Sequence, residues 1–410
     1  MLKSYKYRLD LNNEQKTFMN KSFGCGWVVY NYSLERRIAL YKDGKQKISA
    51  YDLVNEMVQL KRQEGYLWLS EVDHQSLVQS IMNMDNAYKH FFSRGFGFPK
   101  FKCKYSRQSC KFTQSIKIDF ASNKVRFPKI GWVRAYIDRE FTGMIKTTTV
   151  TKNASGEYYV SLLVDNGMEL PANPAVRPEL TIGIDVGVKN IVTFSDGTTI
   201  ANPRNFFKYE ERLALLQQRL SRRDKNRYPD EKDKSSRRRR KAQMAVAKMH
   251  QKIQNTRNDL LQKITSKIIS ENQTIIIEDL NIKGMTATCK PKPNEDNTGF
   301  LPNGQAAKSG LNKSILDVGL GKFFDMLEYK AEWHGKNLIK IGRFEPSSKL
   351  CSNCKHKNTD RKLKDRVWTC ANCGTEHDRD VNAAVNIKEI GLKQYYSQTK
   401  SGQGMPVADV

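Results

Sequence analysis

The chain has 410 residues, of which 70 are Lys or Arg and 43 are Asp or Glu, so its formal net charge is +27. Hydrophobic residues make up 39% of the sequence, which is typical of globular proteins and excludes wholesale disorder. The sequence contains no run of about 18 apolar residues, which excludes a membrane-spanning protein, and its first residues lack the apolar segment of a secretion signal. We therefore expect a cytoplasmic prokaryotic protein of several packed units with a polyanionic partner, most often a nucleic acid.

The first 170 residues predict one strand, a helical segment and a strand-rich segment, in that order. Residues 1–10 alternate enough for an edge strand, and residues 12–92 follow a helical periodicity. Gly95 and Gly97 interrupt that periodicity. Residues 98–170 are short runs rich in β-branched and aromatic side chains, which predict strands joined by turns. The N-terminal part should therefore combine helices with a sheet.

Two stretches concentrate the positive charge. Within residues 100–107, Lys and Arg alternate with aromatic side chains, which suits a sheet that holds a nucleic-acid backbone, although solvated strand faces explain the pattern equally well. Residues 219–257 carry 15 Lys or Arg against 4 Asp or Glu, and this clustering favours phosphate binding over a basic surface without a partner. For any single arginine, a solvated helix surface is the alternative. The candidate nucleic-acid-binding residues are Arg219, Arg222, Arg223, Arg237, Arg238, Arg239, Arg240 and Lys241.

A linker and two acidic residues on predicted strands follow. Residues 171–178 are rich in proline and predict a linker to a new unit. The apolar strand at 180–184 runs into Asp185, and an aspartate within a buried strand needs compensation, usually by a bound cation. Glu278 follows three isoleucines, at the carboxyl end of a strand, where ligands bind in open α/β sheets. Because Asp279 points to the opposite face, Glu278 is the favoured candidate.

A third acidic candidate lies near the C-terminus. Asp380 precedes by one turn a helical apolar stripe that begins with Ala383 and Ala384, so Asp380 should face the sheet. Asp378 does not continue this stripe and is interpreted as a helix cap or a solvent-facing charge.

Three carboxylates on separate apolar elements indicate a cation site. Like charges held close together raise one another's pKa unless divalent cations neutralise them. Oxygen ligands select Mg²⁺ or Mn²⁺ rather than zinc, and two such ions about 4 Å apart hydrolyse phosphodiesters. Single buried carboxylates are more often caps or ion pairs than catalysts. Together, however, Asp185, Glu278 and Asp380 predict metal-dependent nucleic-acid hydrolysis.

Four of the eight cysteines are spaced as ligands of a second metal. Cys351 and Cys354 form one C-x2-C pair, and a second pair, Cys370 and Cys373, follows after fifteen residues. Two such knuckles bring four thiolates to one centre, which predicts one closed, structural Zn²⁺ site without a catalytic role. Two disulfides are the alternative, which a cytosolic setting disfavours. The remaining cysteines are assigned to packing or to no role: Cys25, Cys103, Cys110 and Cys289.

Three sequence blocks resemble the TnpB family of transposon-associated RNA-guided DNA endonucleases, which are related to the type V CRISPR effectors. The blocks are GIDVGVKNIVTFSDG, IIIEDLNIKGM and CSNC-x15-CANCGTEHDRDVNAAVNI, and the resemblance is most specific over residues 180–391. The N-terminal half matches more loosely, through YKYRLDLNNEQ and FGCGWVVYNYSL. The resemblance implies a RuvC-like nuclease domain with ribonuclease H topology, whose catalytic triad corresponds to Asp185, Glu278 and Asp380.

The same resemblance implies a multi-domain α+β protein with a zinc ribbon inserted in the α/β nuclease domain. The implied domains are a wedge β-barrel (1–10 and 96–172), a helical recognition domain (11–95), the RuvC-like domain (178–345 and 376–395), the target-nucleic-acid-binding zinc ribbon (346–375) and a C-terminal tail (396–410).

The implied function is RNA-guided cleavage of double-stranded DNA with two Mg²⁺ or Mn²⁺ ions. A transposon-derived guide RNA pairs with the target, and the protein, a monomer with its RNA, reads a short flanking motif. Such a protein would associate with the nucleoid when bound to DNA and would have no membrane partner. The alternatives are a non-cleaving RNA-guided regulator, a transposase acting in strand exchange, and a purely structural zinc-containing nucleic-acid binder. We also expect loops at 227–236 and at 286–313, the latter beside the active site.

Overall fold

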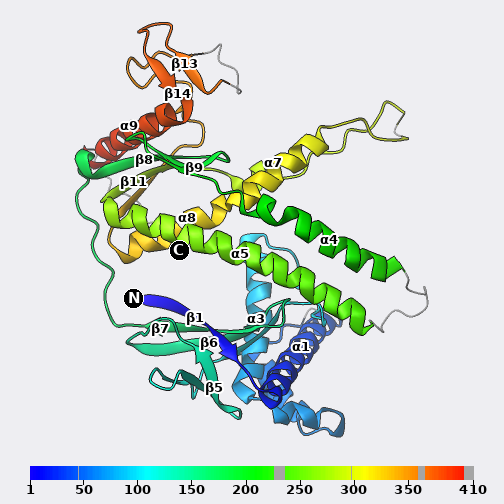
Figure 1. The fold of residues 1–410 in the computed structure, drawn as a ribbon. Helices are drawn as coiled ribbons and strands as arrows, with labels where there is room; N and C mark the ends of the chain where they lie inside the picture. Colours follow the sequence, from blue (N-terminus) through cyan, green and yellow to red (C-terminus); the bar gives the residue numbers. More distant parts are fainter. Residues whose placement is uncertain (45, 226–235, 297, 359–364, 401–410) are drawn as a thin grey trace. The chain divides into compact units, whose positions relative to one another are not determined.

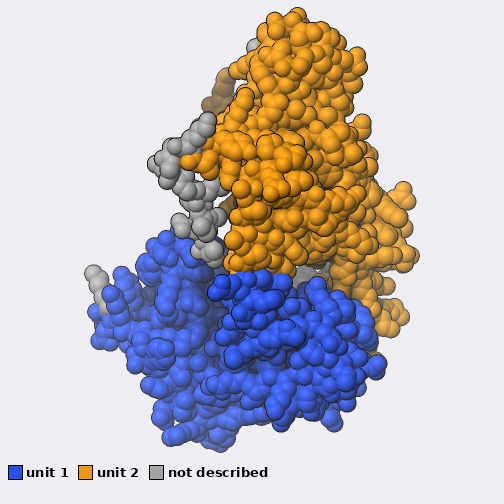
Figure 2. Space-filling view, turned by 90° about the vertical axis from the view of Figure 1, so that its left-hand side faces the viewer, with its two compact units in different colours: residues 1–169 blue, residues 170–410 orange. Residues whose placement is uncertain are grey.

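The computed structural model describes residues 1–44, 46–225, 236–296, 298–358 and 365–400 (Figure 1). The chain divides into two compact units, Met1–Glu169 and Leu170–Val410, which Figure 2 shows in separate colours. Among the described residues, every helix is too short or too polar to cross a membrane.

Unit 1 combines a helical cluster with a seven-stranded antiparallel sheet in the order β2-β6-β7-β1-β5-β4-β3. Strand β1 therefore pairs with β7 and β5, although more than a hundred residues separate it from both in the sequence. Burial alternates along β7, as expected of a strand with one face on a core. The elements are β1 Leu2–Asp10, α1 Asn13–Lys42, α2 Ala50–Leu60, the 3₁₀ helix η1 Glu64–Glu71, α3 His74–Arg94, β2 Gln108–Phe112, β3 Lys117–Asp119, β4 Lys124–Phe127, β5 Gly131–Tyr136, β6 Met144–Lys152 and β7 Tyr158–Asp165.

Unit 2 is built on a five-stranded mixed sheet in the order β10-β9-β8-β11-β12. Strands β8, β11 and β12 are parallel, whereas β9 and β10 are antiparallel to their neighbours. A separate hairpin, β13–β14, precedes the last helix. The elements are the 3₁₀ helix η2 Pro178–Leu180, β8 Thr181–Val186, β9 Asn190–Phe194, β10 Thr199–Ala201, α4 Asn205–Lys225, α5 Arg237–Glu271, β11 Thr274–Glu278, α6 Ile282–Met285, α7 Gln305–Val318, α8 Leu320–Trp333, β12 Asn337–Ile341, β13 Val367–Thr369, β14 Glu376–Asp378 and α9 Arg379–Lys400.

Helices cover both faces of the unit 2 sheet (Figure 1). One face presents residues such as Ile184 and Ile277 to a core shared with α5, α7 and α8. The other face presents Ile276 to a smaller core shared with Ile387 of α9. This burial on both sides explains why β11 reads as a continuous apolar run rather than as an alternating one.

Helix α9 approaches the sheet closely at Gly183. A β-carbon at this position would lie 2.2 Å from the carbonyl oxygen of Ala384 and 2.7 Å from the backbone nitrogen of Lys388. We therefore expect Gly183→Ala to push α9 off the sheet and to lower the free energy of unfolding by about 1–3 kcal/mol.

Urea denaturation of the full chain checks this expectation, with Gly321→Ala as the matched control. Gly321 is a helical glycine in α8, and a β-carbon there meets nothing within 4 Å. The control should therefore be neutral or slightly stabilising. Equal stabilities of the two variants would contradict the close approach.

Most of the predicted elements agree with the structure, and three do not. The predicted edge strand at residues 1–10 is instead an interior strand of its sheet, because β1 pairs with both β7 and β5. Residues 98–107 form no strand, because β2 begins only at Gln108, and the basic and aromatic side chains of 100–107 lie on an irregular segment. The predicted loop 286–313 is too long, because α7 begins at Gln305. Most of the predicted loop 227–236 lies outside the described residues; Ser236 caps α5.

Candidate active site and metal centre

Asp185 and Glu278 lie side by side on neighbouring parallel strands. Ile184 of β8 pairs in register with Ile277 of β11, and each carboxylate is the next residue along its strand. Both side chains therefore point to the sheet face that α9 covers, which is also the face of Gly183. Parallel strands thus place two acidic side chains together at their carboxyl ends.

Asp380 reaches the same region from the first turn of α9. It lies one turn before Ala384, whose carbonyl oxygen approaches Gly183, and Gly183 lies two residues before Asp185. The negative charges of Asp380 and Glu278 both act on Asp185. Three carboxylates that are far apart in the sequence are therefore near neighbours in unit 2.

Burial and negative charge perturb the titration of this group. Burial, followed by the charges of Asp380 and Glu278, raises the pKa of Asp185 to about 7, although Arg379 opposes the shift. Burial also raises the pKa of Glu278, with a smaller contribution from Asp279. Such an accumulation of charge is destabilising unless a cation neutralises it, so the donor set fits a hard divalent cation.

Two arginines engage the carboxylate of Asp380. The Nη1 atom of Arg366 lies 2.6 Å from Oδ2, and the Nε atom of Arg379 lies 2.9 Å from Oδ1. Each oxygen of Asp380 therefore accepts one hydrogen bond from an arginine, which partly neutralises its charge. Among the described residues, only the four cysteines form a metal-ligand cluster, with all ligand atoms within 4.8 Å of one another. The three carboxylates do not form such a cluster.

The two neighbouring aspartates have different roles. Asp378 accepts hydrogen bonds from the backbone N–H groups of Asp380 at 2.9 Å and Val381 at 3.0 Å, so it caps α9, which is one of the two interpretations that the sequence left open. Asp279 is exposed and forms an ion pair with Arg343 at 3.0 Å. Both carboxylates therefore have partners outside the group formed by Asp185, Glu278 and Asp380.

If Asp380 is a metal ligand, as the sequence predicts, Asp380→Ala should abolish nuclease activity. In contrast, Asp378→Ala should cost about 1 kcal/mol of stability through loss of the cap while leaving cleavage intact. Thermal unfolding and a nuclease assay on both variants measure this difference, and Asp378→Ser, which retains a capping oxygen, is the control. Normal cleavage by Asp380→Ala together with loss of cleavage in Asp378→Ala would assign the third ligand to Asp378.

The four cysteines are arranged as ligands of one tetrahedral metal. The Sγ atoms of Cys351 and Cys373 are 3.6 Å apart, as are those of Cys354 and Cys370. Four thiolates around zinc at about 2.3 Å are separated by about 3.8 Å, whereas a disulfide joins sulfurs at about 2 Å. The spacing therefore fits a zinc ion and not two disulfides. The other four cysteines lie outside this cluster.

Polar groups around the cysteines affect their protonation. A hydrogen bond with the Thr375 hydroxyl group lowers the pKa of Cys373 to about 6, which favours the thiolate that binds zinc. Burial raises the pKa of Cys351 to about 11, so its deprotonation depends on the metal.

Sequence reasoning missed His377, which supports this centre. Its Nε2 atom lies 3.0 Å from the Sγ atom of Cys351, and its side chain is buried against Trp368. The alternation along β14, with exposed Glu376 and Asp378 on either side, is the sequence signal that places His377 inward.

The predicted nucleic-acid-binding residues lie at the ends of α4 and α5 that border the undescribed segment. Except for the half-buried Arg239, they are exposed, while Leu213, Met249 and Ile253 pack the two helices together. Arg223 donates a hydrogen bond of 2.8 Å to the carbonyl oxygen of Arg238, which joins the two basic clusters. The charge is thus available to an external polyanion.

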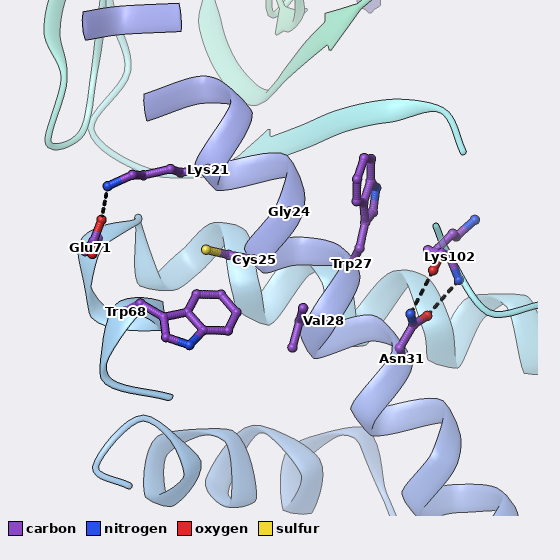
Figure 3. Close-up of a pocket in the computed structure, with 9 residues that line it drawn as sticks. All are labelled: Lys21, Gly24, Cys25, Trp27, Val28, Asn31, Trp68, Glu71 and Lys102. Carbon is purple, nitrogen blue, oxygen red and sulfur yellow. Dashed lines mark hydrogen bonds and ion pairs between the residues drawn. The ribbon is translucent and has the colours of Figure 1, made fainter. Parts of the chain in front are cut away.

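Unit 1 contains a separate pocket of about 450 Å³ (Figure 3). It is lined by Trp68 and Cys25 and closed at one side by the ion pair of Lys21 with Glu71. Burial raises the pKa of Cys25 to about 11, so this thiol is a poor nucleophile. The pocket contains none of the predicted site residues.

Three family models match parts of the chain. They are described as "Cas12f1-like, TNB domain" over residues 321–387, "Probable transposase" over 160–288 and "Helix-turn-helix domain" over 1–46. A helix-turn-helix consists of two short helices, whereas the described part of residues 1–46 forms strand β1 and one long helix, α1.

Similar proteins cover nearly the whole chain. A protein of Streptomyces pristinaespiralis named "Putative RNA-guided DNA endonuclease" is 33% identical, over 95% of this chain and 89% of its own length. "Putative RNA-guided DNA endonuclease InsQ" of Escherichia coli K12 is 30% identical, over 95% of this chain and 92% of its own length. Viral relatives named "TnpB-like protein" match 40% of the chain. The chain therefore belongs to the TnpB family of RNA-guided DNA endonucleases.

A solved structure supports the fold. The chain resembles the protein in a cryo-EM structure of a Cas12f1-sgRNA-target DNA complex, with a TM-score of 0.52 at 15% identity. The match covers 92% of this chain and 83% of that protein. At this identity the likeness concerns the fold alone.

Proposed function

We propose that the protein is an RNA-guided DNA endonuclease that holds divalent cations with Asp185, Glu278 and Asp380. The proposal rests on the proximity of these three side chains at the carboxyl ends of β8 and β11. When bound, Mg²⁺ or Mn²⁺ ions activate water and stabilise the leaving oxygen of a phosphodiester. The chain contributes the acidic oxygens and fixes their positions on two strands and a helix.

The remaining elements suit the other tasks of such an enzyme. In this proposal, the five-stranded sheet with α9 is a RuvC-like domain of ribonuclease H topology, and the residues around the four cysteines form a zinc ribbon that contacts target DNA. The antiparallel sheet of unit 1 is the wedge, and helices α1 to α3 form the recognition domain that reads a flanking motif. Arginines at the facing ends of α4 and α5 bind the phosphates of a guide–target duplex.

Two alternatives are less well supported. A non-cleaving regulator does not need its active-site carboxylates, yet all three are present and adjacent. A transposase that exchanges strands through a covalent protein–DNA intermediate needs a tyrosine or serine nucleophile, for which the sequence has no separate motif. A covalent protein–DNA adduct would revive the second alternative.

The test is cleavage guided by the protein's own RNA. We would purify the protein, sequence the RNA that copurifies with it, and offer linear DNA that matches the guide portion, together with Mg²⁺. A DNA library randomised beside the target identifies the flanking motif. Cleavage of matched but not mismatched DNA is expected. Binding without cleavage by the zinc-loaded, Mg²⁺-supplied protein would contradict the proposal.

A further inference from the structure

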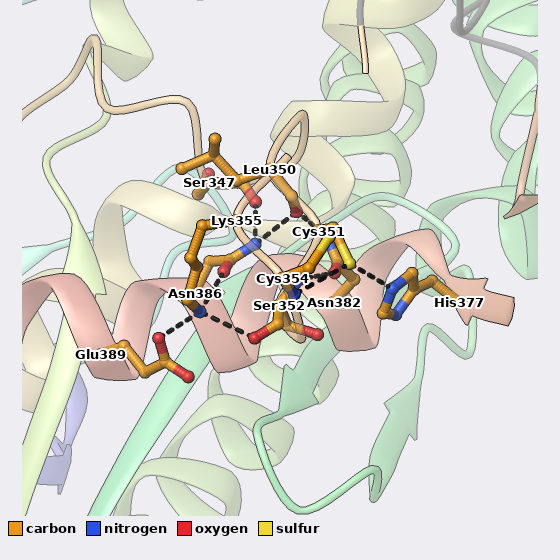
Figure 4. Close-up of polar contacts among 10 residues, drawn as sticks. All are labelled: Ser347, Leu350, Cys351, Ser352, Cys354, Lys355, His377, Asn382, Asn386 and Glu389. Carbon is orange, nitrogen blue, oxygen red and sulfur yellow. Dashed lines mark hydrogen bonds and ion pairs between the residues drawn. The ribbon is translucent and has the colours of Figure 1, made fainter. Parts of the chain in front are cut away.

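Two asparagines of α9 connect this helix to the first cysteine knuckle (Figure 4). Asn382 and Asn386 are 2% and 1% exposed, although each carries an amide group and lies within a helix. A buried amide is costly unless it is hydrogen-bonded, and asparagine is a poor helix former. Neither residue therefore stabilises α9 through helix propensity or apolar packing. The hydrogen bonds of the two amides must offset the cost of burying them.

The amides bind the backbone that leads into Cys351. Asn386 Nδ2 donates to the carbonyl oxygens of Ser347 at 2.8 Å and Leu350 at 2.7 Å. Asn382 Nδ2 donates to the same Leu350 oxygen at 2.7 Å, and its Oδ1 accepts the backbone N–H of Ser352 at 2.8 Å. Figure 4 shows both amides directed at the turn on either side of Cys351. Four hydrogen bonds thus fix one knuckle to the second and third turns of α9.

The second knuckle is joined to the same helix by a different route. After Cys373 the chain forms β14, which pairs with β13 and runs directly into α9. The backbone N–H of Arg379 donates to the carbonyl oxygen of Arg366 at 2.8 Å, so the hairpin holds the first residue of the helix. Both halves of the cysteine cluster are therefore anchored to the N-terminal turns of α9, and Asp380 lies in the first of these turns.

We infer that Asn382 and Asn386 are positioning residues that make the placement of Asp380 depend on zinc. This inference rests on the proposed function. A metal that draws the two cysteine pairs together fixes the turn at residues 347–352, and the amides then hold the start of α9 against the sheet. Without the metal, the turn and the first turns of α9 loosen together, and Asp380 leaves Asp185 and Glu278. The zinc centre thereby supports the geometry of the acidic site in addition to any contact with DNA.

Asn386→Asp and Asn382→Asp test the connection. Each change keeps the size of the side chain but removes the donors, so the carboxylate faces carbonyl oxygens. Glu389→Gln is the matched control, because Glu389 lies on the same helix and pairs with Lys355 of the same knuckle at the surface. The variants are studied as full-length protein, loaded with zinc and freed of excess metal.

Three measurements on these proteins give distinct results. In the two Asp variants we expect Zn²⁺ affinity, measured against a chromophoric chelator, to fall about tenfold or more, in the range typical of lost outer hydrogen bonds. Mn²⁺ affinity at the carboxylates, measured by electron paramagnetic resonance, should fall about tenfold, while the Kd for target DNA changes less than about threefold. Glu389→Gln should match the wild type. Unchanged Mn²⁺ affinity in both Asp variants would overturn the inference.

Hydrogen exchange of the wild-type protein keeps the inference testable even if the variants do not fold. Removal of zinc by a selective chelator should increase exchange at least about tenfold in the amides of residues 381–388, while β11 stays protected. No change in residues 381–388 would overturn the inference. Failure of wild-type Mn²⁺ binding with the exchange response intact would instead overturn the proposed function alone.

Discussion

Asp185→Asn is expected to reduce DNA cleavage by at least about 10³-fold while leaving guide RNA and target binding unchanged. A metal site contributes several kcal/mol to such a reaction, and each 1.36 kcal/mol corresponds to a tenfold change in rate. Asn keeps the size of the side chain but removes the negative charge that a divalent ion requires. Single-turnover cleavage assays and a binding assay on the same protein separate the two effects. Asp196→Asn, at an exposed turn between β9 and β10, is the matched control.

The same substitution should stabilise the protein at alkaline pH. The ordinary carboxyl pKa of 3.8 is raised in folded Asp185 to about 7, so between these values the folded state holds a proton that the unfolded state has released. The free energy of unfolding therefore falls as pH rises through this interval, and the loss is complete above pH 7. The amide of the variant does not titrate. Between pH 4 and pH 8, the stability of Asp185→Asn relative to the wild type should therefore rise by up to about 4 kcal/mol.

Thermal unfolding of the zinc-loaded protein without added Mg²⁺ measures this gain in stability.

Added Mg²⁺ should stabilise the wild type more at pH 8 than at pH 5, because the ion competes with the proton for the carboxylate. It should have little effect on the stability of Asp185→Asn. A variant that is less stable than wild type at pH 8 would show that Asp185 has a structural partner and does not carry an uncompensated charge.

The second large effect is expected from Cys351→Ser. The wild-type protein should contain one zinc per chain, and the variant none, because three thiolates and a hydroxyl bind zinc weakly. We expect a lower soluble yield and an affinity for target DNA at least about tenfold weaker. The reason is that zinc binding contributes to the free energy of folding of the surrounding residues. Elemental analysis and a DNA-binding assay measure both outcomes.

Cys289→Ser is the matched control for that experiment. Cys289 is half-buried and lies outside the cysteine cluster, so its substitution should change neither zinc content nor binding. A wild-type protein without zinc, purified under reducing conditions and without chelator, would contradict the assignment.

Much of the candidate site could be predicted because its elements carry strong local signals. Three isoleucines before Glu278 indicate a buried strand, and the two C-x2-C pairs define a metal site by their spacing alone. The position of Asp378 off the apolar stripe indicates a helix cap or a solvent-facing charge, and the structure shows the cap. These features depend on neighbours within a few residues, so the sequence is sufficient to detect them.

Features that depend on distant residues were missed. The irregular segment 98–107 has the composition of a strand but pairs with no other strand, and composition does not report pairing. The ion pair of Arg366 with Asp380 and the amide contacts of Asn386 join segments that approach only after folding. The need for glycine at position 183 likewise becomes visible only when α9 lies against the sheet.

The most direct measurement of the central claim is the anomalous X-ray signal of Mn²⁺ in crystals of the full-length protein with its RNA and target DNA. We predict Mn²⁺ density within about 2.5 Å of carboxylate oxygens of Asp185, Glu278 and Asp380, beside a DNA phosphate, and its loss in Asp185→Asn crystals. Mn²⁺ density elsewhere, with the three carboxylates free of metal in the DNA-bound complex, would contradict the account.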